Sequence, residues 1–205
     1  MVAGVRTIAL ALALGSCAPE TVVPSVAALS ETVASAPAHT PLVHAPLTAT
    51  DGTPFAAERW RGRWSVIFLG FASCADVCPL TVHALAAVAR DPASGVSAGT
   101  TQLVFVTVDP RRDTRARLRS YLAAFGGGIV GLTGTPAAID HFRDALGGGA
   151  LALGTGFDHS TSLFVLGPDG RPAGLLLRPT EPARIVADLN RLRRRGSDDR
   201  DVAGR

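Results

Sequence analysis

Two short, mainly apolar runs stand out in the hydrophobic pattern: WSVIFLGF at residues 64–71 and QLVFVTV at residues 102–108. Both are too short for a buried helix, and both are rich in β-branched and aromatic residues, which favours strands. Because neither run alternates regularly between apolar and polar positions, we expect both faces of each strand to be covered. The two runs therefore predict central strands of a layered sheet.

Apolar positions at helical spacing predict four helices around these strands. They run from a start within 72–79 to about Arg90, from Asp113 to Phe125, from Thr135 to about Leu146, and from Thr180 to Arg195. Asp113 and Thr114 can cap the second helix, and Thr135 followed by a proline is typical of a helix start. In the first helix we expect Leu80 to face the core with Leu85.

Two hairpins complete the pattern. The first spans residues 47–55 and turns at the Asp-Gly pair 51–52, which accepts positive φ. The second pairs 162–166 with 174–177 across a Gly-Pro-Asp-Gly turn. The order of elements is hairpin, β, α, β, α, α, hairpin, α, which is typical of a thioredoxin-like α/β fold. We therefore expect a central mixed sheet flanked by helices, with the first hairpin as an N-terminal extension.

Composition restricts the classes of function. The chain has 205 residues, which suits one folded domain with added segments, and its 47% hydrophobic content excludes a wholly disordered chain. All 20 basic residues are Arg, the net charge is only +3, and aromatic residues make up 5%. These values argue against a nucleic-acid-binding surface. No apolar run reaches 18 residues, so we expect no full membrane span.

The first 16 residues have the features of a signal peptide, with Arg6 followed by the apolar stretch 8–14. They lead into Leu-Gly-Ser-Cys, which resembles the site at which bacterial lipoproteins are cleaved and lipidated, here at Cys17. This pattern predicts a protein of the bacterial cell envelope that faces the periplasm and is anchored to a membrane by lipid. An ordinary cleaved signal or an uncleaved anchor is the alternative.

Three segments follow the signal peptide. Residues 17–41 are rich in Ala, Pro, Ser and Thr and predict a flexible tether. Residues 42–195 form the predicted thioredoxin-like domain, which is large enough for a core without structural disulfides. Residues 196–205 are a charged tail.

Cys74 and Cys78 are the chemically distinctive residues of the predicted domain, because lipidation of Cys17 would leave them as the two free thiols. They lie where a strand gives way to a helix, and on a helix their spacing would place both sulfurs on one face. Backbone N–H groups and the helix dipole favour thiolates there. The pair could form a disulfide or bind one metal ion. A purely structural disulfide would close so short a loop that it would add little to the stability of the fold.

His159 is the expected third member of this site. It stands before the strand at 162–166, where thioredoxins have a cis-proline and where residues 154–162 contain no proline. In this fold that strand lies beside the strand that leads to the cysteines, so we expect His159 to point at the thiols; the alternative is a structural histidine. Two thiolates and an imidazole form a soft donor set that favours copper, especially Cu(I). The other histidines are expected in the tether or on the surface: His39, His44, His83 and His141.

Four segments in the same order resemble the Sco/SenC family of thioredoxin-like copper proteins, over about residues 45–193. They are FLGFASCADVCP (68–79), VTVDPRRDT (106–114), GLTGTP (131–136) and DHSTSLFVLGPDG (158–170). The resemblance implies a copper chaperone that serves the CuA site in subunit II of cytochrome c oxidase. It also implies Cys74, Cys78 and His159 as copper ligands.

Two acidic residues fall in these segments. Asp109 matches the Asp-Pro of the family, which implies a role beside the metal or in partner recognition; an ordinary turn or helix cap is the alternative. Asp158 is expected to orient His159. The stretch between the GLTGTP helix and Asp158 is short and made of Gly, Ala and Leu, which leaves a client other than the oxidase open.

Two functions remain in competition. The first is a metallochaperone, which delivers copper to CuA or prepares the CuA cysteines, with other periplasmic copper carriers and thioredoxin-like reductases as further partners. A thiol-disulfide oxidoreductase activity alongside copper binding is left open. The second is a client-specific thiol-disulfide oxidoreductase of the periplasm. Both need Cys74 and Cys78, but only the first needs His159. A peroxidase is disfavoured because Thr81 and the arginines do not form the support that a peroxidatic cysteine needs.

Overall fold

The computed structural model describes residues 45–146, 162–177 and 181–203 of the chain. Several predictions lie outside the described residues. They are the signal peptide 1–16, the lipidation site Cys17, the tether 17–41, and the two site residues Asp158 and His159.

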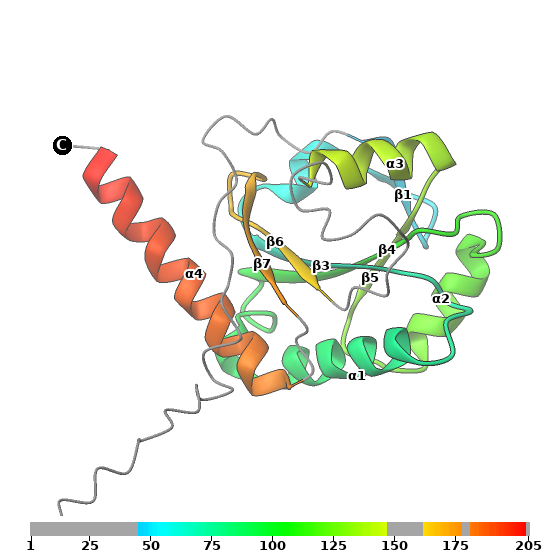
Figure 1. The fold of residues 1–205 in the computed structure, drawn as a ribbon, viewed down its shortest axis with the longest axis horizontal. Coiled ribbons are helices and arrows are strands. Elements are labelled where there is room, and N and C mark those ends of the chain that lie inside the picture. The colour runs from blue at the N-terminus through cyan, green and yellow to red at the C-terminus, as the bar shows by residue number, and fades with distance from the viewer. Residues whose placement is uncertain (1–44, 147–161, 178–180, 204–205) are drawn as a thin grey trace, which may run out of the picture.

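A seven-stranded mixed sheet forms the centre of the molecule, with strand order β2-β1-β5-β4-β3-β6-β7 (Figure 1). Strands β3, β4 and β5 pair in parallel, and all other pairs are antiparallel. The strands are β1 (Leu47–Ala49), β2 (Pro54–Phe55), β3 (Trp64–Gly70), β4 (Thr101–Thr107), β5 (Val130–Thr133), β6 (Leu163–Leu166) and β7 (Pro172–Leu176). This arrangement confirms the predicted central mixed sheet and its N-terminal hairpin.

Four α-helices and two short 3-10 helices cover the sheet. The α-helices are α1 (Val77–Arg90), α2 (Arg115–Ala123), α3 (Pro136–Ala145) and α4 (Pro182–Ala203). The 3-10 helices are η2 (Ala57–Trp60) and η3 (Pro92–Ser94). Helix α1 lies on one side of the sheet and α3 on the other, and α4 extends away from the sheet at its C-terminal end (Figure 1).

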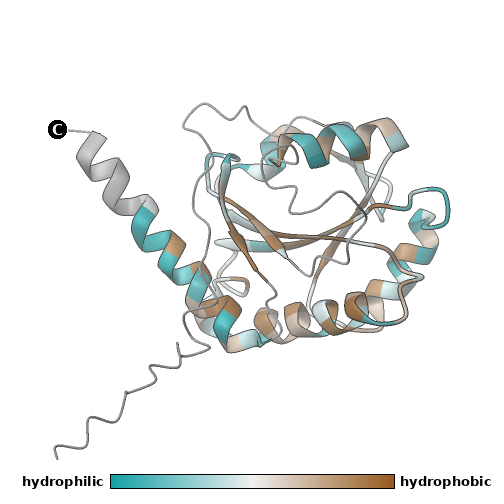
Figure 2. Cartoon of the chain, viewed as in Figure 1, coloured by the Kyte–Doolittle hydropathy of each residue, from teal (hydrophilic) through white to brown (hydrophobic). Residues whose placement is uncertain are grey.

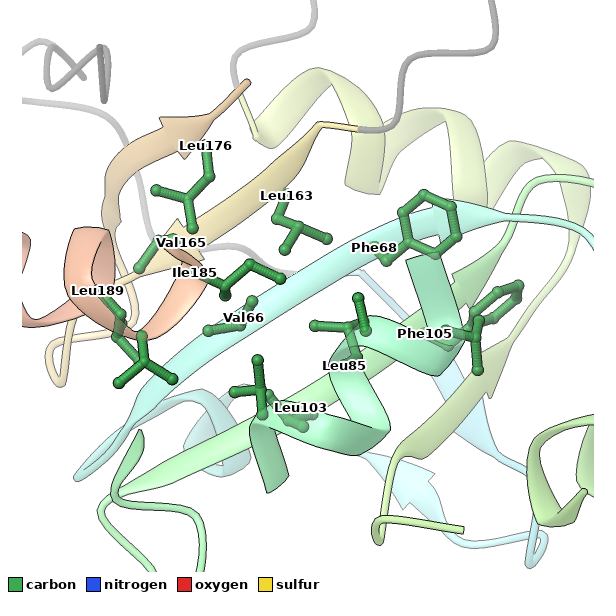
Figure 3. Packing of buried hydrophobic residues seen from close by; sticks show 14 of the residues in the cluster. Val66, Phe68, Leu85, Leu103, Phe105, Leu163, Val165, Leu176, Ile185 and Leu189 are labelled. Carbon is green, nitrogen blue, oxygen red and sulfur yellow. The ribbon is translucent and has the colours of Figure 1, made fainter. Parts of the chain in front are cut away.

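The central strands separate two hydrophobic cores because successive side chains of a strand point to opposite faces. In β3, Val66 and Phe68 belong to the core beneath α1, α2 and α4, whereas Ile67 belongs to the core beneath α3. Figure 3 shows the first core, where side chains from the strands meet Leu85 of α1 and Leu189 of α4. Hydrophobic residues are concentrated on the central strands in Figure 2, as expected for strands covered on both faces.

Strand β5 was not predicted from the sequence. It joins the hairpin to the rest of the sheet, since β1 pairs with β5 on one side and β4 pairs with β5 on the other. Position 131 of this strand needs a glycine for a steric reason, because a Cβ there would lie 2.6 Å from Leu122 and 2.8 Å from Thr50. The N-terminal hairpin is therefore the edge of the main sheet.

Two details of the predicted helices were wrong. Leu80 is 64% exposed instead of facing the core, because it lies in the first turn of α1 and the inward face is formed by Val82, Leu85 and Val88. Helix α4 continues to Ala203, past the predicted end at Arg195. It continues through Gly196, although a glycine inside a helix costs about 1 kcal/mol relative to alanine. Among the described helices, none is both long and apolar enough to span a bilayer.

Candidate metal centre

The loop between β3 and α1 carries the cysteines and leaves the sheet at the carboxyl end of β3. Gly70 stands at this exit, where a Cβ would lie 2.9 Å from the Phe68 ring and 3.1 Å from the Phe105 ring. The Gly70 carbonyl accepts a hydrogen bond from Val108 N–H at 2.8 Å, so the loop starts at a fixed point beside the end of β4. Within the loop, Cys74 N–H donates to the Phe71 carbonyl at 3.2 Å.

Cys74 and Cys78 lie on different elements, which corrects the expectation that both share a helix face. Cys74 is in the loop and half-buried, whereas Cys78 is in the first turn of α1 and only 4% exposed. The two residues still face each other, because Cys78 N–H donates a hydrogen bond to Cys74 Sγ at 3.5 Å. Both thiols are free, so the structure presents a dithiol.

The two thiols have opposite acidities. Burial is the largest single influence on the pKa of Cys74 and raises it. Hydrogen bonds from the backbone of Asp76, Cys78 and Val77 and from the Cys78 thiol together outweigh burial, and the pKa falls below the ordinary value. Burial is the main reason that the pKa of Cys78 rises to about 12. Cys74 is therefore the more acidic and more accessible thiol, and Cys78 holds its proton.

A pocket of about 320 Å³ opens beside Cys74, and it is lined by residues 71 and 73–77. The exposed Leu80 lies on α1, about one turn after the pocket residue Val77. A metal ion or a client side chain can therefore approach Cys74 from solvent, whereas Cys78 is buried.

Asp109 occupies the turn that follows β4. Its carboxylate accepts a hydrogen bond from Arg112 N–H at 3.4 Å, and it lies 3.5 Å from the Arg112 guanidinium. These are contacts within its own turn.

Asp113 and Tyr121 are two site residues that sequence reasoning missed. Asp113 is fully buried, and its Oδ2 accepts a hydrogen bond from Ala72 N–H in the cysteine loop at 2.8 Å. The Tyr121 hydroxyl is buried and has no hydrogen-bond partner among the described residues. Its pKa is raised mainly by burial, with smaller contributions from Cys78, Cys74 and Asp113, which places its hydroxyl in the electrostatic field of the dithiol. From the sequence, Asp113 was expected only as a helix cap, and Tyr121 lay in the helix predicted from Asp113 to Phe125.

The chain enters β6 beside the cysteine loop. Strand β6 runs antiparallel to β3, with Leu163 opposite Phe68, so the residue before β6 lies at the end of β3 where the loop begins. This confirms the expected neighbour strand, while the predicted ligand His159 lies outside the described residues. His83 and His141 are exposed, as expected. Within the described ranges, no group of three or more His, Cys, Asp or Glu side chains is arranged to hold a metal ion.

The two described donors suit a soft metal ion. Thiolates bind Cu(I) well as a pair, and a structural zinc site would normally need four protein ligands. The open side of Cys74 would let a metal ion enter and leave.

Comparisons with known proteins find relatives in both sequence and fold. The chain is 30% identical over 146 residues to the mitochondrial SCO2 homolog of Mus musculus, covering 68% of this chain and 57% of that protein. The copper-bound crystal structure of yeast Sco1 matches with a TM-score of 0.61 and 28% identity, covering 74% of this chain and 92% of that one. Copper-bound ScoI of Bradyrhizobium japonicum matches with a TM-score of 0.59 and 28% identity, covering 72% and 96%. The chain spans about half to two thirds of the length of the curated relatives it matches.

The family model described as SCO1/SenC matches residues 43–194, which include the whole sheet, the cysteine loop and most of α4. The thioredoxin-like fold and the order of the four sequence segments agree with that match. The chain belongs to the SCO1/SenC family.

Proposed function

We propose that this protein is a copper-binding metallochaperone, and that Cys74, Cys78 and His159 bind one copper ion. The observation that carries the proposal is the free dithiol, in which an accessible acidic thiol faces a buried thiol at the start of α1. The copper-bound Sco structures that match this fold support the choice of metal.

The thiol acidities predict how copper is taken up. Cys74 is poised as the first ligand, because it is the more exposed thiol and carries the lower pKa. Copper must then displace the proton of Cys78, whose pKa is about 12. Because metal binding releases protons, copper affinity should fall as the pH is lowered. On release, a client thiol would enter at the open side of the site, beside the accessible Cys74.

The position of β6 supports His159 as the third ligand. Ser162 is buried next to the start of β6, at the end of β3 from which the cysteine loop leaves. His159 precedes it by three residues, and three residues reach at most about 10 Å. The imidazole would serve Cu(II) more than Cu(I), because Cu(II) prefers nitrogen and more ligands.

We further propose that the client is the CuA site in subunit II of cytochrome c oxidase, to which the protein delivers copper or whose cysteines it prepares. We place the protein at the periplasmic face of a bacterial membrane, anchored by lipid at Cys17 through the tether 17–41. Mass spectrometry of the protein purified from membranes tests the anchor. We expect the mature chain to begin at a diacylglyceryl-modified Cys17; an unmodified Cys17 or a different first residue would contradict it.

The copper site is tested by titrating the reduced full-length chain carrying Cys17→Ser with Cu(I) and Cu(II). We expect one copper per chain and a thiolate-to-Cu(II) charge-transfer band. His159→Ala should weaken Cu(II) binding more than Cu(I) binding and shift or abolish the band. His141→Ala, on the exposed face of α3, is the matched control and should change neither. Equal Cu(II) affinities for the two variants would refute His159 as a ligand.

A client-specific thiol-disulfide oxidoreductase is the second candidate, favoured by the asymmetry between the two thiols. An accessible thiol of lowered pKa beside a buried protonated thiol suits attack on a client disulfide. The two functions are separated in cells at limiting copper. Loss of oxidase activity in the His159→Ala strain supports copper delivery, whereas normal activity with the variant expressed supports the reductase.

A further inference from the structure

Asp113 is a buried carboxylate that the copper site does not use. It is fully buried in the turn between β4 and α2, and it is not the helix cap, because the Thr114 hydroxyl accepts the hydrogen bond from Arg117 N–H. Burying a carboxylate is costly unless charge-assisted hydrogen bonds compensate for the lost water. The contacts of Asp113 should therefore show which segments it holds.

The two side-chain hydrogen bonds of Asp113 join the cysteine loop to the end of β4. Its Oδ2 accepts from Ala72 N–H at 2.8 Å and from the Thr107 hydroxyl at 2.7 Å. Thr107 ends β4 and also accepts from Asp109 N–H at 3.0 Å. The other oxygen, Oδ1, lies 3.8 Å from the half-exposed Arg117 guanidinium.

Ala72 lies two residues before Cys74, in the segment where the chain has left β3 and has not yet entered α1. The sheet holds this segment up to Gly70, whose carbonyl is bonded to Val108 N–H, and α1 holds it from Val77 onward. Between those points, the Asp113 carboxylate holds the backbone from outside the loop.

We propose that Asp113 is a positioning residue for the dithiol, and that its hydrogen bond to Ala72 N–H fixes the loop so that Cys74 Sγ stays opposite Cys78. The proposal rests on the proposed role of Cys74 and Cys78 as the working pair. Under this proposal, Asp113 affects how readily Cys74 and Cys78 form a disulfide, in addition to any effect on the stability of the fold.

The test measures the effective concentration of the two thiols without copper, from the equilibrium between the dithiol and glutathione disulfide. It uses the full-length chain carrying Cys17→Ser, in which Cys74 and Cys78 are the remaining thiols. Asp113→Ala removes the acceptor, and Asp113→Asn keeps an acceptor for Ala72 N–H. Thr107→Val is the matched control, because it removes the other donor to the same oxygen and leaves the loop bond in place.

We expect Asp113→Ala to lower the effective concentration about tenfold, equivalent to freeing the backbone of roughly one loop residue. Asp113→Asn and Thr107→Val should stay within about threefold of the parent, even though urea unfolding shows Thr107→Val to be destabilised. An equal loss in Asp113→Ala and Thr107→Val, or an equal loss in Asp113→Asn and Asp113→Ala, would overturn the proposal. Because no copper is present, a failure here is separate from a failure of copper binding.

A measurement on the unmutated loop covers the case in which Asp113→Ala does not fold. Hydrogen exchange in the reduced Cys17→Ser chain should show the Ala72 amide exchanging at least about tenfold more slowly than the amide of Ala75, an exposed residue of the same loop. Equal exchange at the two amides would show that the carboxylate does not hold the loop and would overturn the proposal.

Discussion

The opposite acidities of the two thiols predict that each reacts with an external disulfide at a very different rate. The comparison uses two single-thiol chains in the Cys17→Ser background: Cys78→Ser, which leaves Cys74, and Cys74→Ser, which leaves Cys78. An aromatic disulfide reagent reports each reaction by absorbance. The thiolate is the attacking species, so both the pKa and the burial of each thiol enter the rate.

The size of the difference can be worked out at pH 8. A thiol with a pKa of about 12 is ionised to roughly one part in 10⁴, whereas an ordinary cysteine is ionised to about a quarter. The ratio of roughly 2,500 is partly offset, because a more basic thiolate is a better nucleophile by roughly 40-fold at a Brønsted slope near 0.45. Cys74 should therefore react at least about 50-fold faster than Cys78. The lowered pKa of Cys74 and the burial of Cys78 both increase this difference in rate.

The pH profiles give a second, independent sign of the same asymmetry. The Cys74 rate should level off at a lower pH than for an ordinary thiol, and the Cys78 rate should still rise about tenfold per pH unit between pH 9 and 10. In strong denaturant the two chains should react alike, because the difference comes from the fold. Native rates within about fivefold of each other, or profiles that level off together, would refute the assignment of an acidic and a buried thiol.

Three further predictions concern the stability of the fold. Arg193→Ala should lower the free energy of unfolding in urea by about 2 kcal/mol, because this half-buried guanidinium donates to carbonyls of the η3 segment and to the first residue of β4. Arg195→Ala, at an exposed residue of the same helix, is the control and should change stability little. Gly127→Ala and Gly128→Ala should each cost about 1–2 kcal/mol of stability, because both glycines have positive φ. Gly127→Ala should cost more than this, because a Cβ at Gly127 would lie 2.8 Å from a backbone atom of α1 whereas a Cβ at Gly128 would meet nothing. Equal losses would contradict the steric argument. Because the pKa of Cys78 is raised, the folded state keeps a proton that the unfolded chain releases at high pH. The stability that this proton gives the fold is present below about pH 8.5 and is lost as the pH rises toward 12, by up to about 1.4 kcal/mol per pH unit. Urea unfolding between pH 8 and 10 should show this loss in the parent and a smaller one in Cys78→Ser.

The strands that carry the site were predictable because their signals are local. The runs at 64–71 and 102–108 are mainly apolar, and they became β3 and β4 within one residue of the predicted bounds. Strand β5 was missed because its four residues include Gly131 and follow a run of glycines, so that its sequence is typical of a loop. What makes it a strand is tertiary: Gly131 allows Leu122 and Thr50 to approach the backbone.

The site was predictable in its chemistry and less so in its geometry. A Cys-x3-Cys pair at a strand-to-helix junction identifies the dithiol, but where α1 begins decides that Cys74 lies in a loop. The role of Asp113 could not be derived from its own segment, where Asp113 and Thr114 are equally good caps. The difference between them depends on Ala72, a partner 41 residues away.

The sheet order also affects how the chain reaches its folded state. Within β3, Val66 pairs with Leu103 on one side and with Val165 on the other, so the second pairing closes a much longer loop than the first. Longer loops cost more chain entropy to close, so β3, α1 and β4 should assemble before β6 joins them. A chain that ends before Leu163 would therefore contain both cysteines of the site but leave one side of β3 unpaired. An exposed apolar strand edge promotes association between chains, so such a truncated product should aggregate.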